Sequence, residues 1–100
     1  MKQKSKEWIK QADYDIDTAV FMFDGGRFFY AVFMCHLSIE KALKGLLIEK
    51  KRQIPPRTHN LILLISQIGI AMPAEMRKFL TKLNESSVAT RYPEELDKIS

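Results

Sequence analysis

The chain has 100 residues, the length of one small domain, so we expect residues 1–100 to fold as a single unit. Apolar residues make up 46% of it, which excludes a disordered chain. The longest apolar run, 28–35, is much shorter than the roughly 20 residues of a membrane-spanning helix. The charged start, MKQKSKEW, is followed by no apolar segment, unlike a secretory signal. With one cysteine and no zinc-like cluster, we expect a reduced cytoplasmic domain without metal or cofactor.

Positive charge is concentrated in the middle of the chain. Sixteen Lys and Arg against twelve Asp and Glu give a net charge of +4, and residues 41–57 contain six bases and one acid. This density is typical of a surface that faces phosphates or an acidic partner. The alternative is that cations gather at a helix C-terminus, where the helix dipole favours them.

The first predicted helix spans about Lys4–Asp24. Ser5 is its candidate cap, and Gly25-Gly26 supplies its end. Apolar residues recur at helical spacing and predict the buried face: Trp8, Ala12, Ile16, Ala19 and Phe23.

The second predicted helix spans about Phe28–Lys51. Its start, FFYAVFMC, would also suit a buried strand, but the pattern continues without a turn signal and so favours a helix. The first half is apolar nearly all round, so we expect it in the centre of a bundle or in a subunit interface. The helical stripe consists of Val32, Cys35, Ile39, Ala42 and Leu46.

Two shorter helices are predicted after a connection at Arg52–Arg57, where Pro55-Pro56 prevents helical hydrogen bonding. Thr58 is the candidate cap of the third helix and Gly69 ends it, with Leu61, Leu64, Ile65 and Ile68 facing inward. Pro73 begins the fourth, with Met76, Phe79, Leu80 and Leu83 on its buried face. Thr90-Arg91-Tyr92-Pro93 breaks the pattern before a short acidic tail. The expected fold is an all-α antiparallel bundle of four main helices.

Several catalytic motifs are missing from the sequence. It has no glycine-rich phosphate loop, no HExxH and no G-x-S-x-G. Cys35, on an apolar helix face, is expected to be a small core residue rather than a nucleophile.

His36, Glu40 and Lys44 form one polar file on the second helix, at positions i, i+4 and i+8. The file suits proton handling or a surface that faces phosphate. It equally suits a solvated or interhelical polar seam, with Glu40 and Lys44 as an ion pair. The sequence leaves open whether His36 points toward the loop that holds His59.

His59 follows the basic connection at a predicted helix start. With Arg57 and Arg52 alongside, the helix N-terminus could bind an anion, and a neutral imidazole there could act as a general base. Alternatively, His59 only hydrogen-bonds within the connection. Arg91 and Tyr92 could clamp a phosphate and stack on a base, or could dock the tail on the core.

The chain resembles the HEPN family (higher eukaryote and prokaryote nucleotide-binding). Five segments in order carry the resemblance: 8–12 with Asp15, Gly26–Phe33, His36–Leu46, Pro56–Leu61 and Thr90–Pro93. The resemblance implies a helical bundle, commonly dimeric, that binds nucleotides or RNA, often beside a minimal nucleotidyltransferase. Family members generally continue into another helix after Arg-Tyr-Pro, whereas this chain stops at Ser100. We therefore expect a truncated form or a groove covered by a partner.

Many relatives are metal-independent ribonuclease toxins with an Arg, four to six residues, then a His, which Arg52 and His59 match formally. Gln53 and the Pro55-Pro56 pair depart from that motif, and the chain looks closer to the branch with Thr-His-Asn-Leu and Arg-Tyr-Pro segments. We therefore expect a nucleotide- or RNA-binding module, homodimeric, with a nucleotidyltransferase partner in a toxin–antitoxin-like pair. The predicted binding residues are His36, Glu40, Lys44, Arg57, His59, Arg91 and Tyr92. The alternatives are a ribonuclease that uses His59 with Arg52 or Arg57, and a protein–protein adaptor.

Overall fold

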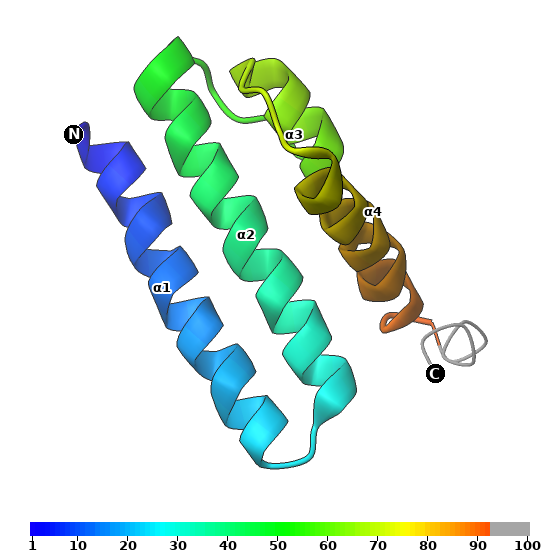
Figure 1. Cartoon of the computed structure of the whole chain (residues 1–100). Coiled ribbons are helices and arrows are strands. Elements are labelled where there is room, and N and C mark those ends of the chain that lie inside the picture. Colours follow the sequence, from blue (N-terminus) through cyan, green and yellow to red (C-terminus); the bar gives the residue numbers. More distant parts are fainter. Residues whose placement is uncertain (93–100) are drawn as a thin grey trace.

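The fold is a bundle of four helices, as the sequence predicts. The computed structural model describes residues 1–92, which contain no strand (Figure 1). The helices are α1 (Gln3–Asp24), α2 (Phe28–Lys51), α3 (Leu61–Ile68) and α4 (Ala74–Ala89). Pro93 and the acidic tail lie outside the described residues. None of the four helices is both long enough and apolar enough to cross a membrane.

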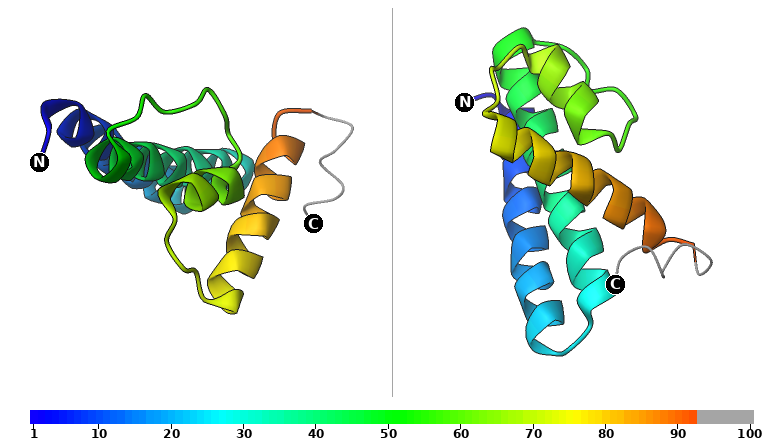
Figure 2. Two further views of the ribbon diagram at one scale, coloured as in Figure 1. Left: turned by 90° about the horizontal axis from the view of Figure 1, so that it is seen from above. Right: turned by 45° about the vertical axis from the view of Figure 1, so that its right-hand side comes forward.

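Helix α2 is the centre of the arrangement. Helix α1 runs antiparallel to it and packs on α2 alone (Figure 1). Helices α3 and α4 pack on α2 and on each other, and α4 crosses α2 obliquely (Figure 2). A side chain on α2 can therefore contact α1 on one side and the α3–α4 pair on the other.

The buried face of α1 differs from the predicted one. Ala12 and Ala19 are buried as predicted, but Ile16 and Phe23 are exposed, and Ser5 and Asp15 are buried instead. Ser5 is therefore not the cap, because the helix begins at Gln3 and Ser5 points into the α1–α2 contact. The spacing of apolar residues did not predict that Ser5 and Asp15 are buried, because both residues are polar.

Small and polar groups join α1 to α2 at short range. The Ser38 hydroxyl donates to the Ala12 carbonyl oxygen at 2.7 Å. Lys41 Nζ lies 2.8 Å from a carboxylate oxygen of Asp15. A Cβ placed on Gly45 would lie only 3.1 Å from Trp8 Cβ, so the glycine allows the two helices to approach closely.

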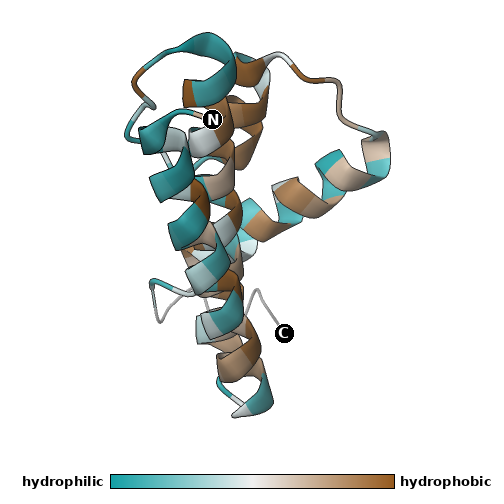
Figure 3. Cartoon of the chain, turned by 90° about the vertical axis from the view of Figure 1, so that its left-hand side faces the viewer, coloured by the Kyte–Doolittle hydropathy of each residue, from teal (hydrophilic) through white to brown (hydrophobic). Residues whose placement is uncertain are grey.

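The apolar first half of α2 is only partly in the centre of the bundle, because Val32 and Cys35 pack on the core whereas the first turn does not. Phe28, Phe29 and Tyr30 are exposed, and the Phe23 and Phe28 rings meet edge to face with centroids 5.4 Å apart. Hydrophobic residues gather at this hairpin end of α1 and α2 (Figure 3). The other sequence-based alternative, that this apolar segment lies in a subunit interface, stays a prediction.

The stripe from Val32 to Leu46 is half-buried, and three of its members, Val32, Cys35 and Ile39, pack against the core of α3 and α4. Burial raises the pKa of the Cys35 thiol and so disfavours the thiolate. Both observations agree with a packing role for this cysteine.

Helix α3 has the predicted buried face, and Gly69 ends it in the left-handed conformation, with a φ of 81°. Its cap is Asn60 rather than Thr58. The Asn60 side-chain oxygen accepts from the backbone N–H groups of Ile62 and Leu63.

Helix α4 follows Pro73 as predicted, and Leu80 and Leu83 join Leu61 and Ile65 in the core. Met76 and Phe79, however, are exposed. Because α4 crosses α2 obliquely, its second half makes the packed contact, and its first turns extend away (Figure 2).

Substitution of Gly45 by Ala tests the close approach of α1 and α2. Alanine gains about 1 kcal/mol in helix propensity. The new methyl group, however, would meet the Ser5 carbonyl oxygen at 3.2 Å and Trp8 Cβ at 3.1 Å. We expect overpacking to win and the free energy of unfolding to fall by about 1–2 kcal/mol. Urea unfolding measures this free energy, and Lys50→Ala, at an exposed position of the same helix, is the control. A gain in stability in Gly45→Ala would contradict the close packing.

Candidate functional site

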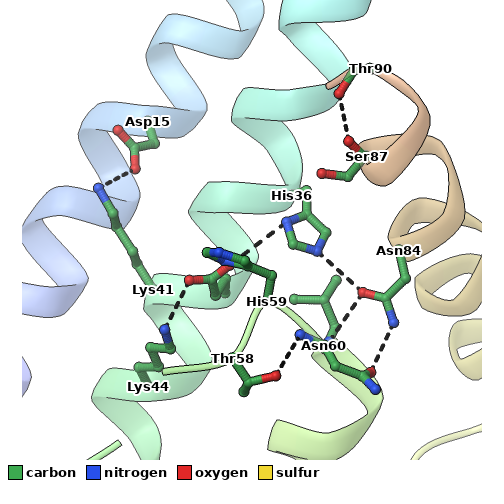
Figure 4. A network of polar contacts seen from close by, with 12 residues as sticks. Asp15, His36, Lys41, Lys44, Thr58, His59, Asn60, Asn84, Ser87 and Thr90 are labelled. Carbon is green, nitrogen blue, oxygen red and sulfur yellow. Dashed lines mark hydrogen bonds and ion pairs between the residues drawn. The ribbon is translucent and has the colours of Figure 1, made fainter. Parts of the chain in front are cut away.

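Glu40 lies at the centre of a buried polar network (Figure 4). Glu40 is only 3% exposed to solvent. One carboxylate oxygen, Oε2, lies 2.9 Å from Lys44 Nζ, and the other, Oε1, lies 2.8 Å from His59 Nδ1 and 3.9 Å from His36 Nδ1. The polar file on α2 is therefore a buried interhelical seam and not a solvated face. Both histidine rings approach the same oxygen, which answers the question that the sequence left open.

Two asparagines determine the tautomer of His36. Asn60 Oδ1 accepts from two backbone N–H groups, so the Asn84 amide nitrogen donates to it, at 3.0 Å. Asn84 therefore turns its oxygen, Oδ1, toward the Leu61 N–H at 3.1 Å and His36 Nε2 at 3.2 Å. Because an amide oxygen only accepts, His36 Nε2 must carry a proton and donate.

His59 is oriented in the opposite way. Its Nδ1 faces the Glu40 carboxylate and therefore donates to it. In the neutral ring the free nitrogen is then Nε2. The His59 side chain is 63% exposed, so solutes can reach this ring. A buried carboxylate that fixes an accessible imidazole is an arrangement that serves anion binding or proton transfer.

A cavity of about 290 Å³ opens beside these groups, between the His59 connection and α4. We call it the His59 cavity. His36, His59, Asn60, Asn84, Ser87 and Arg91 contribute to its lining. Two of its buried polar atoms, His36 Nδ1 and Ser87 Oγ, have no hydrogen-bond partner within residues 1–92. Unpaired buried polar atoms are costly, so they are unusual features in the residues that line a cavity.

Arg91 supplies the positive charge of the His59 cavity. Its guanidinium carbon lies 5.0 Å from the centre of the Phe33 ring, a cation–π contact that orients the side chain. Tyr92 is exposed, lines neither this cavity nor the larger one described next, and is not docked on the core.

The structure places the other predicted cations elsewhere. Lys44, Arg52 and Arg57 line a larger cavity of about 660 Å³ together with Trp8, which we call the Trp8 cavity. Arg52 and His59 therefore line different cavities. Part of the charge run does lie at a helix C-terminus, since Lys50 and Lys51 occupy the last turn of α2.

Asn60 and Asn84 are the site residues that sequence reasoning did not single out. Asn84 lies in the middle of α4, where asparagine is a poor helix former. Such a residue is a weak signal that its side chain has another role. Its partners come from 23 to 48 positions away in sequence, so only the fold reveals what that role is.

Comparison with known proteins identifies the family. The model of the HEPN domain matches residues 5–98. The chain belongs to the HEPN domain family. No curated protein and no solved structure matches it. HEPN membership, with the helical bundle, indicates a nucleotide- or RNA-related module, and it leaves the particular branch of the family undetermined.

Within residues 1–92 of this HEPN domain, no group of three or more His, Cys, Asp or Glu side chains is arranged to hold a metal ion. The polar atoms of the site are directed at one another and at the His59 cavity. The imidazoles of His36 and His59 and the guanidinium of Arg91 are groups suited to anion binding and proton transfer.

The pKa of His36 provides a test of the buried network. Burial lowers this pKa below its ordinary value of 6.5, and contact with Asn84 and Glu40 opposes the shift only in part. The neutral ring is thus favoured in the folded state. Stability from this source is complete above pH 6.5 and is lost as the pH falls toward the lower folded pKa.

We therefore expect the free energy of unfolding to decrease between about pH 7 and about pH 5. His36→Gln keeps an N–H donor near Asn84 and removes the titrating ring, so its decrease should be smaller. Urea unfolding across this range measures both proteins. Equal decreases would show that His36 does not titrate as its burial implies.

Proposed function

We propose that this HEPN domain binds a nucleotide, free or as part of an RNA strand, in the His59 cavity. The observation that carries the proposal is the Glu40-held His59 ring beside Arg91 and two unpaired buried polar atoms. Arg91 offers a bidentate contact for phosphate. Asn84 and Asn60 line the same cavity. The volume, near the lower end of ligand pockets, suits one nucleotide unit.

In this proposal the domain acts with a minimal nucleotidyltransferase in a toxin–antitoxin-like pair in the cytoplasm. It forms a homodimer through the exposed aromatic end of α1 and α2, which carries Phe21, Phe23, Phe28 and Phe29. Several exposed large apolar side chains at one end of a molecule are typical of protein interfaces. Co-purification with the nucleotidyltransferase examines the pairing, and sedimentation of the Phe28→Asp variant examines the dimer.

Binding of fluorescently labelled single-stranded RNA, followed by anisotropy, tests the proposed site. Arg91→Ala removes the phosphate contact, so we expect the Kd to rise about tenfold, which corresponds to roughly 1.4 kcal/mol. Arg77→Ala is the control, since Arg77 is an exposed arginine on α4, the helix that precedes Arg91, and does not line the His59 cavity. Equal losses in the two variants would reveal only general charge attraction and would contradict the site.

A second candidate function is metal-independent cleavage of RNA. It is favoured by the Glu40–His59 contact, because a carboxylate that holds imidazole Nδ1–H leaves Nε2 free for proton transfer. The 2′-hydroxyl would lose its proton to Nε2 and attack phosphorus to form a 2′,3′-cyclic phosphate, and the 5′-oxygen would leave as a hydroxyl with a proton from water. Arg52 and Arg57 line the other cavity, so Arg91 is the cation placed to stabilise the phosphate in this chain.

Incubation with single-stranded RNA in EDTA decides between the two candidates. For a nuclease we expect cut RNA and intact DNA, with a rate at least about 100-fold lower in His59→Ala. Glu40→Gln keeps an acceptor for Nδ1–H but removes the charge, so it should be intermediate. If neither wild type nor variant cuts RNA, the binding function alone remains. If RNA and nucleotides do not bind at all, the adaptor alternative takes its place.

A further inference from the structure

The Trp8 cavity is separate from the His59 cavity and lies at the end of the bundle where α1 begins and α2 ends. The start of α1 forms one wall, and the 52–57 connection forms the opposite one. Figure 1 shows the N-terminus beside this end of α2. Its volume of about 660 Å³ is in the usual range for small-molecule sites.

The charge of the cavity wall is strongly positive. Five cationic residues contribute to the lining, namely Lys2, Lys4, Lys44, Arg52 and Arg57, against one acidic residue, Glu7. Lys44 is neutralised by Glu40. The other four side chains make no ion pair within the described part of the chain, so their charges are available to an anion.

The same cavity has a flat apolar surface. Trp8 is half-buried in the wall, and Ile48, Pro55 and Pro56 line it as well. The Lys44 ammonium lies 5.7 Å from the centre of the Trp8 ring and helps to fix its orientation. An inorganic anion would leave this surface unused, and an uncharged aromatic molecule would leave the four cations unpaired.

Arg52 ends α2 as its C-cap in the left-handed conformation, and its N–H donates to the Ile48 carbonyl oxygen. Arg52 is the only non-glycine residue of the described chain with a positive φ, 54°. This left-handed conformation costs an arginine free energy that a glycine would not lose. It also brings Arg52 into the lining together with Arg57, at the two ends of the connection.

We infer that the Trp8 cavity is a second ligand site, which binds a nucleoside phosphate through its cations and its aromatic wall. The phosphates contact Lys4, Arg52 and Arg57, and the base lies against Trp8 and the proline pair. Stacking and charge act together here, as they do where aromatic and basic side chains bind single nucleotides. This site does not depend on the function proposed for the His59 cavity.

Trp8 is the only tryptophan of the chain, so its fluorescence reports on this cavity alone. Titration of the purified full-length protein with ATP should change the emission saturably. Adenosine and inorganic triphosphate each supply only half of the chemistry, so each should bind at least about tenfold more weakly.

Matched variants locate the binding. Lys4→Gln and Arg57→Gln should each raise the Kd for ATP at least about fivefold, because a phosphate contact is lost. Lys10→Gln removes the same charge from the same helix outside the lining, so it should change the Kd by less than about twofold. Arg91→Ala should also leave ATP binding at Trp8 unchanged, which separates this site from the His59 cavity. Circular dichroism confirms that each variant is folded.

Three results would overturn the inference. One is the absence of any saturable response of Trp8 to ATP. Another is an equal loss in Lys4→Gln and Lys10→Gln, which would indicate general charge attraction. The third is saturable binding of a glutamate-rich peptide by a protein that does not bind ATP, because the cavity would then be a docking site for an acidic partner.

Discussion

The structure of this HEPN domain depends on the burial of one carboxylate. A charged Glu40 in the middle of α2 is tolerated only because partners from different parts of the chain surround it. Lys44 comes from the next turn of the same helix, whereas His59 comes from the connection beyond the Pro55-Pro56 pair. His36, one turn earlier, extends the network through Asn84 to α4. The connection and α4 are therefore held on α2 by polar contacts as well as by the apolar core.

A second constraint is the narrow contact between α1 and α2. Because Gly45 has no side chain, Trp8 comes to the surface of α2 one residue away from Lys44. The Ser38 and Lys41 contacts hold the same pair of helices further along. Helix α1 touches none of the other helices, so among the helices it is attached through α2 alone. The same packing that fixes α1 also forms the aromatic wall of the Trp8 cavity.

Much of this fold could be predicted from local sequence signals. The end of α3 at Gly69, the start of α4 after Pro73 and the buried face of α3 depend on backbone conformation and on nearby residues. The structure confirms all three predictions. The buried faces of α1 and α4 could not be predicted in full, since the neighbouring helices determine which side is covered. Ile16 and Met76 satisfied the apolar spacing and still face solvent. The file His36–Glu40–Lys44 was visible as a helical face, but its burial depends on Asn84 and on the connection, which are distant in sequence.

The spacing between Arg52 and His59 shows why a sequence interval is a poor guide to geometry here. The two prolines between them turn the chain, so Arg52 lines one cavity and His59 the other. Glu40 nevertheless links one lining residue of each cavity, because its Oε2 contacts Lys44 and its Oε1 contacts His59. Lys44 and the His59 Nδ1–H therefore share the negative charge of one carboxylate, so the residue that holds the accessible imidazole is also the residue that neutralises Lys44 in the wall of the Trp8 cavity.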